Sequence, residues 1–155
     1  MPDFPPQYDM HQSLGFLINR TGRRLGHALR TVFQENGFDI TPAQWGVLCF
    51  LANRDGVNQQ ELAEISSRDK TTLARVIKGM EKRGLIARVP DKADRRQNHL
   101  FLTREGAKLR DALVPLVKAI QEQYEKGFDP QHLTIFKEGL NRVFENLAHL
   151  EKLDS

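Results

Sequence analysis

The sequence predicts a mainly α-helical protein with a small β-hairpin, because apolar residues recur at steps of three and four through most of the chain. Between residues 85 and 102 this pattern changes to two short apolar runs that flank a polar loop, as in a hairpin. Glycines at the ends of the helical stretches act as stop signals that divide the chain into elements. With 155 residues the chain can bury a core without a disulfide, and its single cysteine cannot form one internally.

The first predicted helix lies within residues 10–40. Asp9 is its expected cap, with Gln12 three residues later as in a capping box, and Asn36-Gly37 ends it. Its inward positions alternate steps of four and three, which is the spacing of a coiled-coil-like seam. These positions are Leu14, Ile18, Thr21, Leu25, Ala28 and Val32.

Three shorter helices are expected next. The second opens at Thr41-Pro42-Ala43-Gln44 with a capping threonine, a proline at the first helical position and a glutamine that reaches back. Asn58 caps a short third helix in a similar way. After a tight connection at Ser66-Ser67-Arg68, Asp69 caps a fourth helix that ends at Gly84.

A hairpin and two longer helices complete the predicted chain. Leu85 to Val89 and Asn98 to Leu102 are the expected strands. Thr103 caps a fifth helix, in which Pro115 predicts a kink. Asp129-Pro130 starts a sixth helix whose apolar residues again alternate steps of three and four.

This order predicts four parts, namely a loose tail over residues 1–9, a dimerisation helix over 10–40, a globular lobe over 41–103 and C-terminal dimerisation helices over 104–155. The outer helices carry apolar seams that need a partner, so we expect one helical layer that continues across a two-fold axis into a second copy. An intramolecular bundle is the alternative. The expected dimerisation residues are Leu14, Ile18, Leu133, Phe136, Leu140, Val143, Leu147 and Leu150.

Positive charge is concentrated in the middle of the chain. Residues 41–104 carry twelve basic and seven acidic side chains, whereas residues 1–40 are balanced and residues 105–155 have two more acids than bases. A basic segment between neutral or acidic flanks is typical of a surface that binds a polyanion. A solvated charged face is the alternative, and charge alone does not separate the two.

A short helix, a tight turn and a second helix form a helix-turn-helix, whose second helix lies in the major groove of DNA. Here this recognition helix is expected over residues 69–83, with apolar side chains on one side and basic and hydroxyl side chains on the other. Arg75 suits a bidentate contact to guanine, and Thr71 suits a thymine methyl group or a phosphate. The expected contacts from this region are Arg68, Lys70, Thr71, Thr72, Arg75, Lys78 and Lys82.

The hairpin loop over residues 90–97 is too polar to be buried. Arg95 and Arg96 at its tip suit the narrow, negative minor groove of DNA. Asp94 is expected to orient a neighbouring guanidinium through a bidentate pair, and an ordinary turn aspartate is the alternative. Together these elements predict a winged helix-turn-helix lobe that binds double-stranded DNA, with the hairpin as its wing.

Short runs of residues stand at characteristic positions along the chain. They are Thr41-Pro42-Ala43-Gln44-Trp45, Met80-Glu81-Lys82-Arg83-Gly84-Leu85-Ile86, Arg88-Val89-Pro90, Asp94-Arg95-Arg96 and Leu102-Thr103-Arg104-Glu105-Gly106. In their order and spacing these runs resemble the multiple-antibiotic-resistance regulator (MarR) family. The resemblance covers about residues 11–150, which is nearly the whole chain.

The resemblance implies a homodimeric repressor bound to a pseudo-palindromic operator, with the first, fifth and sixth helices in the dimer layer. It implies that Arg96 reaches the minor groove and that Asp94 supports it. It also implies release by a small aromatic or phenolic effector, held between the dimer layer and the lobe. The candidate pocket residues are Arg20, Arg24, His27, Trp45 and Cys49.

These pocket residues also have simpler interpretations. Arginine suits a carboxylate and Trp45 suits an aromatic ring, but a core tryptophan and solvated arginines are the alternative. Cys49 lies within an apolar helix, where a cysteine is typically inert packing. Family members that sense hydroperoxides carry a cysteine near the start of the first helix, and this chain has none there.

Other classes of function are poorly supported by the sequence. The five histidines are scattered without a two-histidine ligand spacing, so we expect no metal site. No phosphate-binding glycine loop, nucleophile motif or carboxylate pair indicates an enzyme, and no cofactor is expected to be required. The N-terminus is unlike a signal peptide and no apolar run could span a bilayer, so we expect a cytoplasmic protein without a membrane partner.

Two alternatives to a sequence-specific regulator follow. One is a winged helix that serves protein contacts or non-specific nucleic-acid binding. The other is an enzyme that uses the cavity implied by the resemblance, which rests on analogy of fold alone.

Overall fold

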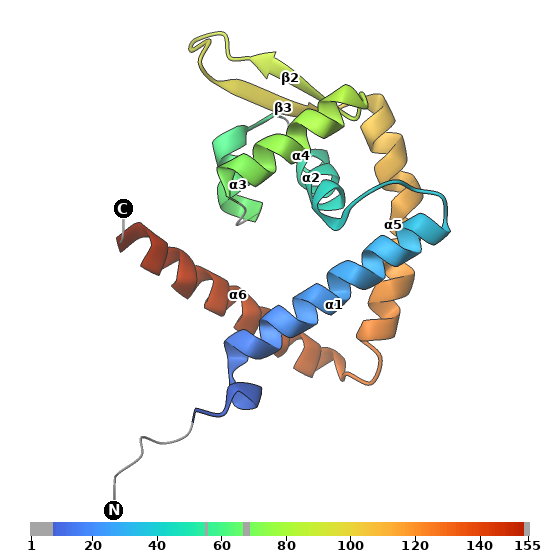
Figure 1. The fold of residues 1–155 in the computed structure, drawn as a ribbon, viewed down its shortest axis with the longest axis vertical. Coiled ribbons are helices and arrows are strands. Elements are labelled where there is room, and N and C mark those ends of the chain that lie inside the picture. The colour runs from blue at the N-terminus through green and yellow to red at the C-terminus, as the bar shows by residue number, and fades with distance from the viewer. Residues whose placement is uncertain (1–7, 55, 67–68, 154–155) are drawn as a thin grey trace, which may run out of the picture. The chain divides into compact units, whose positions relative to one another are not determined.

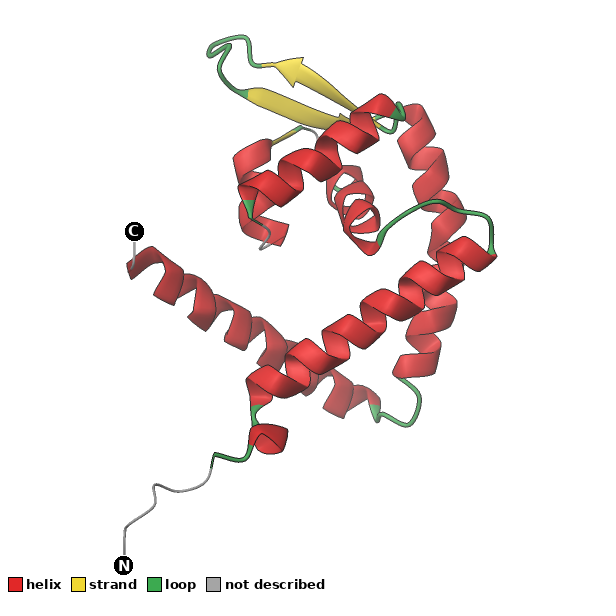
Figure 2. Ribbon diagram, in the orientation of Figure 1, coloured by secondary structure: helices red, strands yellow, loops and turns green. Residues whose placement is uncertain are grey.

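The computed structural model describes residues 8–54, 56–66 and 69–153. It confirms a mainly helical chain with a small antiparallel sheet (Figures 1 and 2). The elements in chain order are η1 (Met10–Gln12), α1 (Leu14–Glu35), α2 (Pro42–Ala52), β1 (Val57–Asn58), α3 (Gln59–Ser66), α4 (Lys70–Lys82), β2 (Ile86–Pro90), β3 (Asn98–Leu102), α5 (Arg104–Tyr124) and α6 (Pro130–Leu153).

The chain forms two compact units, residues 1–117 and 118–155. The first unit holds α1 to α4, the sheet and most of α5, and the second holds the end of α5 and α6. The division of the chain into a DNA-binding lobe and a helical dimer layer therefore stays a prediction, because the dimer layer requires a second copy.

The sheet has the order β1-β3-β2, so β3 is its central strand. In the antiparallel register Ile86 pairs with Leu102 and Pro90 pairs with Asn98. The two-residue strand β1 was not expected, because two residues are too few to show the alternation that marks a strand. By pairing Val57 with Leu100, β1 ties the middle of β3 to the start of α3.

The core of the first unit draws one or more side chains from every long element. Its fully buried members lie on α1, α2, β1, α3, α4, β3 and α5, so the lobe is anchored to α1 and α5 by apolar packing. They include Phe33, Leu48, Leu62, Leu73, Ile77, Met80, Leu100 and Leu113.

The helix starts follow the capping residues closely, with one correction. Thr41 and Gln44 form the expected capping box of α2, and the Asn58 side chain accepts from the backbone N–H of Glu61 at 2.8 Å. The first helix, however, begins at Leu14 with Ser13 as its cap. Asp9 instead accepts from His11 N–H and caps the short helix η1, which uses the residues expected in the first turn of α1.

The hairpin joins α5 through a tight junction. The Thr103 hydroxyl donates to the carbonyl of Gly84 at 2.6 Å and accepts from the backbone N–H of Gly106 at 3.0 Å, so Thr103 caps α5 as expected. A Cβ atom at Gly106 would lie 2.7 Å from Leu102 Cδ1 and would overlap the carbonyl oxygen of Leu85. Glycine at this position lets the wing and α5 pack directly against each other.

Candidate nucleic-acid interface

The recognition helix expected over residues 69–83 is observed as α4. Asp69 caps it by accepting from the backbone N–H of Thr72 at 2.8 Å. Hydrogen bonding to the Thr72 side chain, and then to its backbone amide, lowers the pKa of the Asp69 carboxyl below its ordinary value. One side of α4 is buried through Leu73, Ile77 and Met80. The helix can therefore present only its opposite side to a ligand.

The predicted DNA-contacting residues of α4 lie mostly on that opposite side. Thr72 is half-buried beside the cap, and Arg68 lies outside the described residues. Among the described residues, no ion pair within 4.0 Å engages a lysine or arginine of α4. The exposed members are Lys70, Thr71, Arg75, Lys78 and Lys82.

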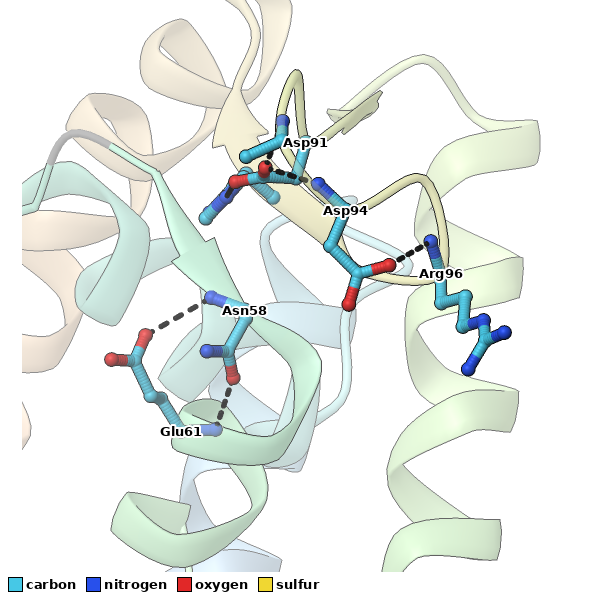
Figure 3. A network of polar contacts seen from close by, with 7 residues as sticks. Asn58, Glu61, Asp91, Asp94 and Arg96 are labelled. Atoms are coloured by element: carbon cyan, nitrogen blue, oxygen red, sulfur yellow. Dashed lines mark hydrogen bonds and ion pairs between the residues drawn. The ribbon is translucent and has the colours of Figure 1, made fainter.

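The wing loop is organised by a residue that the sequence analysis did not single out. Asp91 accepts from the backbone N–H groups of Ala93 and Asp94, at 2.6 and 2.9 Å, and from His99 Nε2 at 2.7 Å (Figure 3). The His99 hydrogen bond, followed by the two backbone ones, lowers the pKa of Asp91 to about 2. An aspartate at the start of a polar loop, followed two residues later by small or polar residues, was the available signal.

Asp94 supports Arg96 in a different way from the one predicted. Its carboxylate accepts from the backbone N–H of Arg96 at 3.0 Å, whereas the Arg96 side chain points away from it (Figure 3). A guanidinium pair with Asp94 is not among the ion pairs of the described residues. Asp94 therefore acts as a turn aspartate that shapes the loop carrying the exposed side chains of Arg95 and Arg96.

The structure brings Arg96 close to the first turn of α3. A polar cavity of about 240 Å³ is lined by residues of the wing and of the β1–α3 segment. Apart from Arg96, all of its lining side chains are amides, which can both donate and accept hydrogen bonds. They are Asn58, Gln59, Gln60, Gln97 and Asn98. No local sequence pattern indicates this cavity, because its walls come from segments that lie about forty residues apart.

The candidate effector residues lie on two neighbouring helices of the first unit. Arg20, Arg24 and His27 are exposed on α1, and the Arg20 guanidinium lies 5.4 Å from the centre of the Phe16 ring. Trp45 on α2 is half-buried and packs against the core, with its ring 6.3 Å from that of Phe33. Trp45 therefore packs against the core, as in the simpler of the two interpretations of this residue.

Cys49 is half-buried on the same helix as Trp45. Burial raises the pKa of the Cys49 thiol, and the nearby positive charge of Arg110 on α5 opposes that rise in part. A raised pKa leaves little thiolate at neutral pH, which is unfavourable for redox reactivity.

The described residues also bear on metal binding and on membrane insertion. No group of three or more histidine, cysteine, aspartate or glutamate side chains among them could hold a metal ion. Across the same residues, no helix is both long enough and apolar enough to cross a bilayer.

Comparison with known proteins identifies the family. The transcriptional regulator HosA of Escherichia coli O127:H6 is 34% identical over 124 residues, which cover 76% of this chain and 92% of HosA. The family model described as "MarR family" matches residues 40–97, from the loop before α2 to the end of the wing loop. The chain belongs to the MarR family.

Two further relatives bear on MarR function. The transcriptional repressor NicR of Pseudomonas putida is 31% identical over 117 residues, which cover 74% of this chain and 72% of NicR. A solved structure of Bordetella bronchiseptica BpsR, whose DNA binding is regulated by 6-hydroxynicotinic acid, superimposes with a TM-score of 0.79 at 25% identity. It covers 88% of this chain and 96% of the BpsR chain. The protein is thus a DNA-binding transcriptional regulator with a winged helix-turn-helix.

Proposed function

We propose that the protein binds a pseudo-palindromic operator as a homodimer, with α4 in the major groove and the loop over residues 90–97 in the minor groove. One observation carries this proposal. The buried side of α4 leaves Arg75, Lys78 and Lys82 exposed on a helix that packs beside β2, the first strand of the wing (Figure 1). A basic helix face next to a protruding basic loop suits adjacent grooves of one duplex.

The apolar surface of α6 supports the homodimer. None of its residues from Pro130 to Leu150 is buried in the single chain, and several large apolar side chains are exposed. A second copy would cover this surface and would place two recognition helices about one turn of DNA apart, roughly 34 Å. The exposed residues are Ile135, Phe136, Phe144, Leu147 and Leu150, of which Ile135 and Phe144 were not among those expected from the sequence.

Repression, with release by a small aromatic acid, is the mode of regulation that we propose. NicR is a repressor, and BpsR responds to a hydroxylated aromatic acid. The exposed guanidinium groups of Arg20 and Arg24, with the exposed His27 imidazole as a hydrogen-bond donor, would suit the carboxylate of such an effector, and Trp45 would suit its ring. This assignment of an effector to α1 and α2 is a proposal that ligand titration can test.

The first test is fluorescence anisotropy on the duplex upstream of the protein's own gene, against a scrambled duplex, at two salt concentrations. We expect preferential binding to the upstream duplex and a steep loss of affinity with salt, because cations on α4 and the wing displace condensed counterions. Addition of 6-hydroxynicotinic acid or a simple phenolic acid would then test release, with benzyl alcohol as an uncharged aromatic control.

Equal and weak binding to both duplexes would favour a winged helix used for protein contacts or non-specific binding. A selection from random duplexes, made after removal of any co-purified ligand, would separate that outcome from an operator at another locus. An enriched palindromic sequence would restore the regulator proposal, and no enrichment would overturn it.

A further inference from the structure

Arg88 lies at the centre of a polar network that joins three elements of the lobe. Its Nε and Nη2 atoms each donate to the Glu81 carboxylate at 3.0 Å, one to each oxygen, in a bidentate pair. Its Nη1 atom donates to Gln59 Oε1 at 3.3 Å. Arg88 belongs to β2 of the wing, Glu81 to the last turn of α4, and Gln59 to the first turn of α3.

This network links β2, through side chains, to the helices α3 and α4. Backbone hydrogen bonds hold β2 only to β3, which lies on one side of it, because β2 is an edge strand of the sheet. The Arg88 side chain supplies a link from β2 to both helices of the helix-turn-helix. A bidentate pair between a guanidinium and a carboxylate has a defined geometry. It therefore restricts the angle between β2 and α4 as well as the distance between them.

The same contacts argue against Arg88 as a DNA ligand. Each of its three guanidinium nitrogens donates to a protein oxygen, and Glu81 balances its positive charge. The Arg88 and Glu81 side chains are 32% and 28% exposed, so both are partly withdrawn from solvent. Arg96, by contrast, has an exposed side chain that points away from the loop (Figure 3).

We propose that Arg88 is a positioning residue, which with Glu81 and Gln59 holds the wing against α4 so that both can contact one duplex together. This inference rests on the proposed function for its effect on DNA affinity. In the sequence Arg88 stands out only as part of the run that resembles the family, because its partners lie 7 and 29 residues away and no local pattern joins them.

Glu81→Gln is the decisive variant, because charge and positioning predict opposite results. Removal of an acid from a DNA-binding lobe raises affinity through charge alone. Loss of a bidentate pair should instead lower operator affinity, by about two- to fivefold on the usual scale of partly exposed ion pairs. Glu64→Gln on α3 is the matched control, since it removes the same charge from an exposed site, and among the described residues Glu64 makes no hydrogen bond or ion pair to the wing.

The expected result is weaker operator binding by Glu81→Gln and unchanged or tighter binding by Glu64→Gln. Equal or tighter binding by Glu81→Gln, with wild-type thermal stability, would overturn the proposal.

A second measurement combines Arg88→Gln with Arg96→Ala. If Arg88 acts by placing the wing, the double variant should lose less affinity than the two single losses multiplied together. Simple multiplication would indicate independent contacts.

Hydrogen exchange in the absence of DNA separates this inference from the proposed function. Glu81→Gln should speed exchange of the paired amides of β2 and β3 by about fivefold or more, while α5 amides stay unchanged, because local opening of the hairpin meets less resistance. Unchanged exchange at the hairpin would count against Arg88 as an anchor. Failure of wild-type protein to prefer any duplex would overturn the proposed function and leave the exchange result standing by itself.

Discussion

At the scale of single residues, the direction of each cation on α4 is set by its apolar neighbours. Arg75 stands two positions from both Leu73 and Ile77, which are fully buried. Two positions correspond to about 200° around an α-helix, so Arg75 must point away from the core. This alternation is a local property, and for that reason the sequence predicted the exposed face of α4 correctly.

Arg75→Ala should reduce sequence discrimination. Loss of a bidentate contact to a base is expected to lower operator affinity by about 1–3 kcal/mol and to leave affinity for scrambled DNA less affected. Lys78→Ala is the matched comparison, because a phosphate contact carries no sequence information. It should weaken both duplexes alike and reduce the salt dependence by about one counterion. Anisotropy titrations of both variants on both duplexes distinguish these patterns, and identical patterns would contradict the assignment.

Gly106→Ala should destabilise the junction between the wing and α5. The added methyl group would overlap the Leu85 carbonyl oxygen, which is backbone and cannot rotate away. A cost of about 1–3 kcal/mol in the free energy of unfolding is expected from such overpacking. Gly79→Ala on α4 is the control, since nothing lies within 4 Å of its Cβ position. It should stabilise the helix by about 0.4–1 kcal/mol. Urea unfolding at one protein concentration measures both changes.

At the scale of elements, the capping residues in the sequence predicted where helices begin, because a cap depends on hydrogen bonds to neighbouring residues. The caps at Thr41, Asn58 and Asp69 bond within three residues of themselves, so the starts of α2, α3 and α4 could be predicted. The short strand β1, the pair of Asp91 with His99 and the Arg88 network depend on residues that only the folded chain brings together. Asp94 was the intermediate case, since the expected guanidinium pair is not observed, whereas the alternative of a turn aspartate that accepts from a backbone amide is.

The wing loop should lose order in acid as Asp91 becomes protonated. Hydrogen bonds from His99 and from two backbone amides lower the pKa of Asp91 to about 2, against about 4 in an unfolded chain. A lowered pKa means that Asp91 stabilises the folded wing above about pH 4, and that this contribution disappears as pH falls from about 4 to 2. Asp91→Asn should therefore lower the thermal stability at pH 6, and its difference from wild type should shrink below pH 4.

His99→Ala is the companion variant for Asp91. It removes the largest cause of the lowered pKa, so the acid transition of the wing should move to higher pH. Hydrogen exchange of the Gln97 amide, which donates to the Asp94 carbonyl in the same loop, reports the transition directly. A transition at the same pH in wild type and His99→Ala would contradict this role for the pair.

At the scale of the whole molecule, the spacing of apolar residues on α6 indicated a seam without indicating what covers it. A helix with an exposed apolar seam can satisfy it within its own chain or against a second copy, and the three-four spacing is the same in both cases. In the single chain Leu147 is 54% exposed and Leu150 is 58% exposed, so neither side chain is buried by other residues of the same chain. Exposed patches of this kind are typical of protein interfaces.

Leu147→Glu should therefore break the dimer and leave the lobe folded. A glutamate within an apolar interface would be buried without a partner, so sedimentation equilibrium should show weaker self-association, by a factor on the order of ten or more. Asn141→Glu is the matched control, because it adds the same charge to the same helix at an exposed polar position. Operator affinity of Leu147→Glu should fall by about 10²-fold or more, since two half-sites are no longer linked, while circular dichroism stays unchanged. A variant that remains dimeric but melts earlier, independently of concentration, would favour the intramolecular bundle.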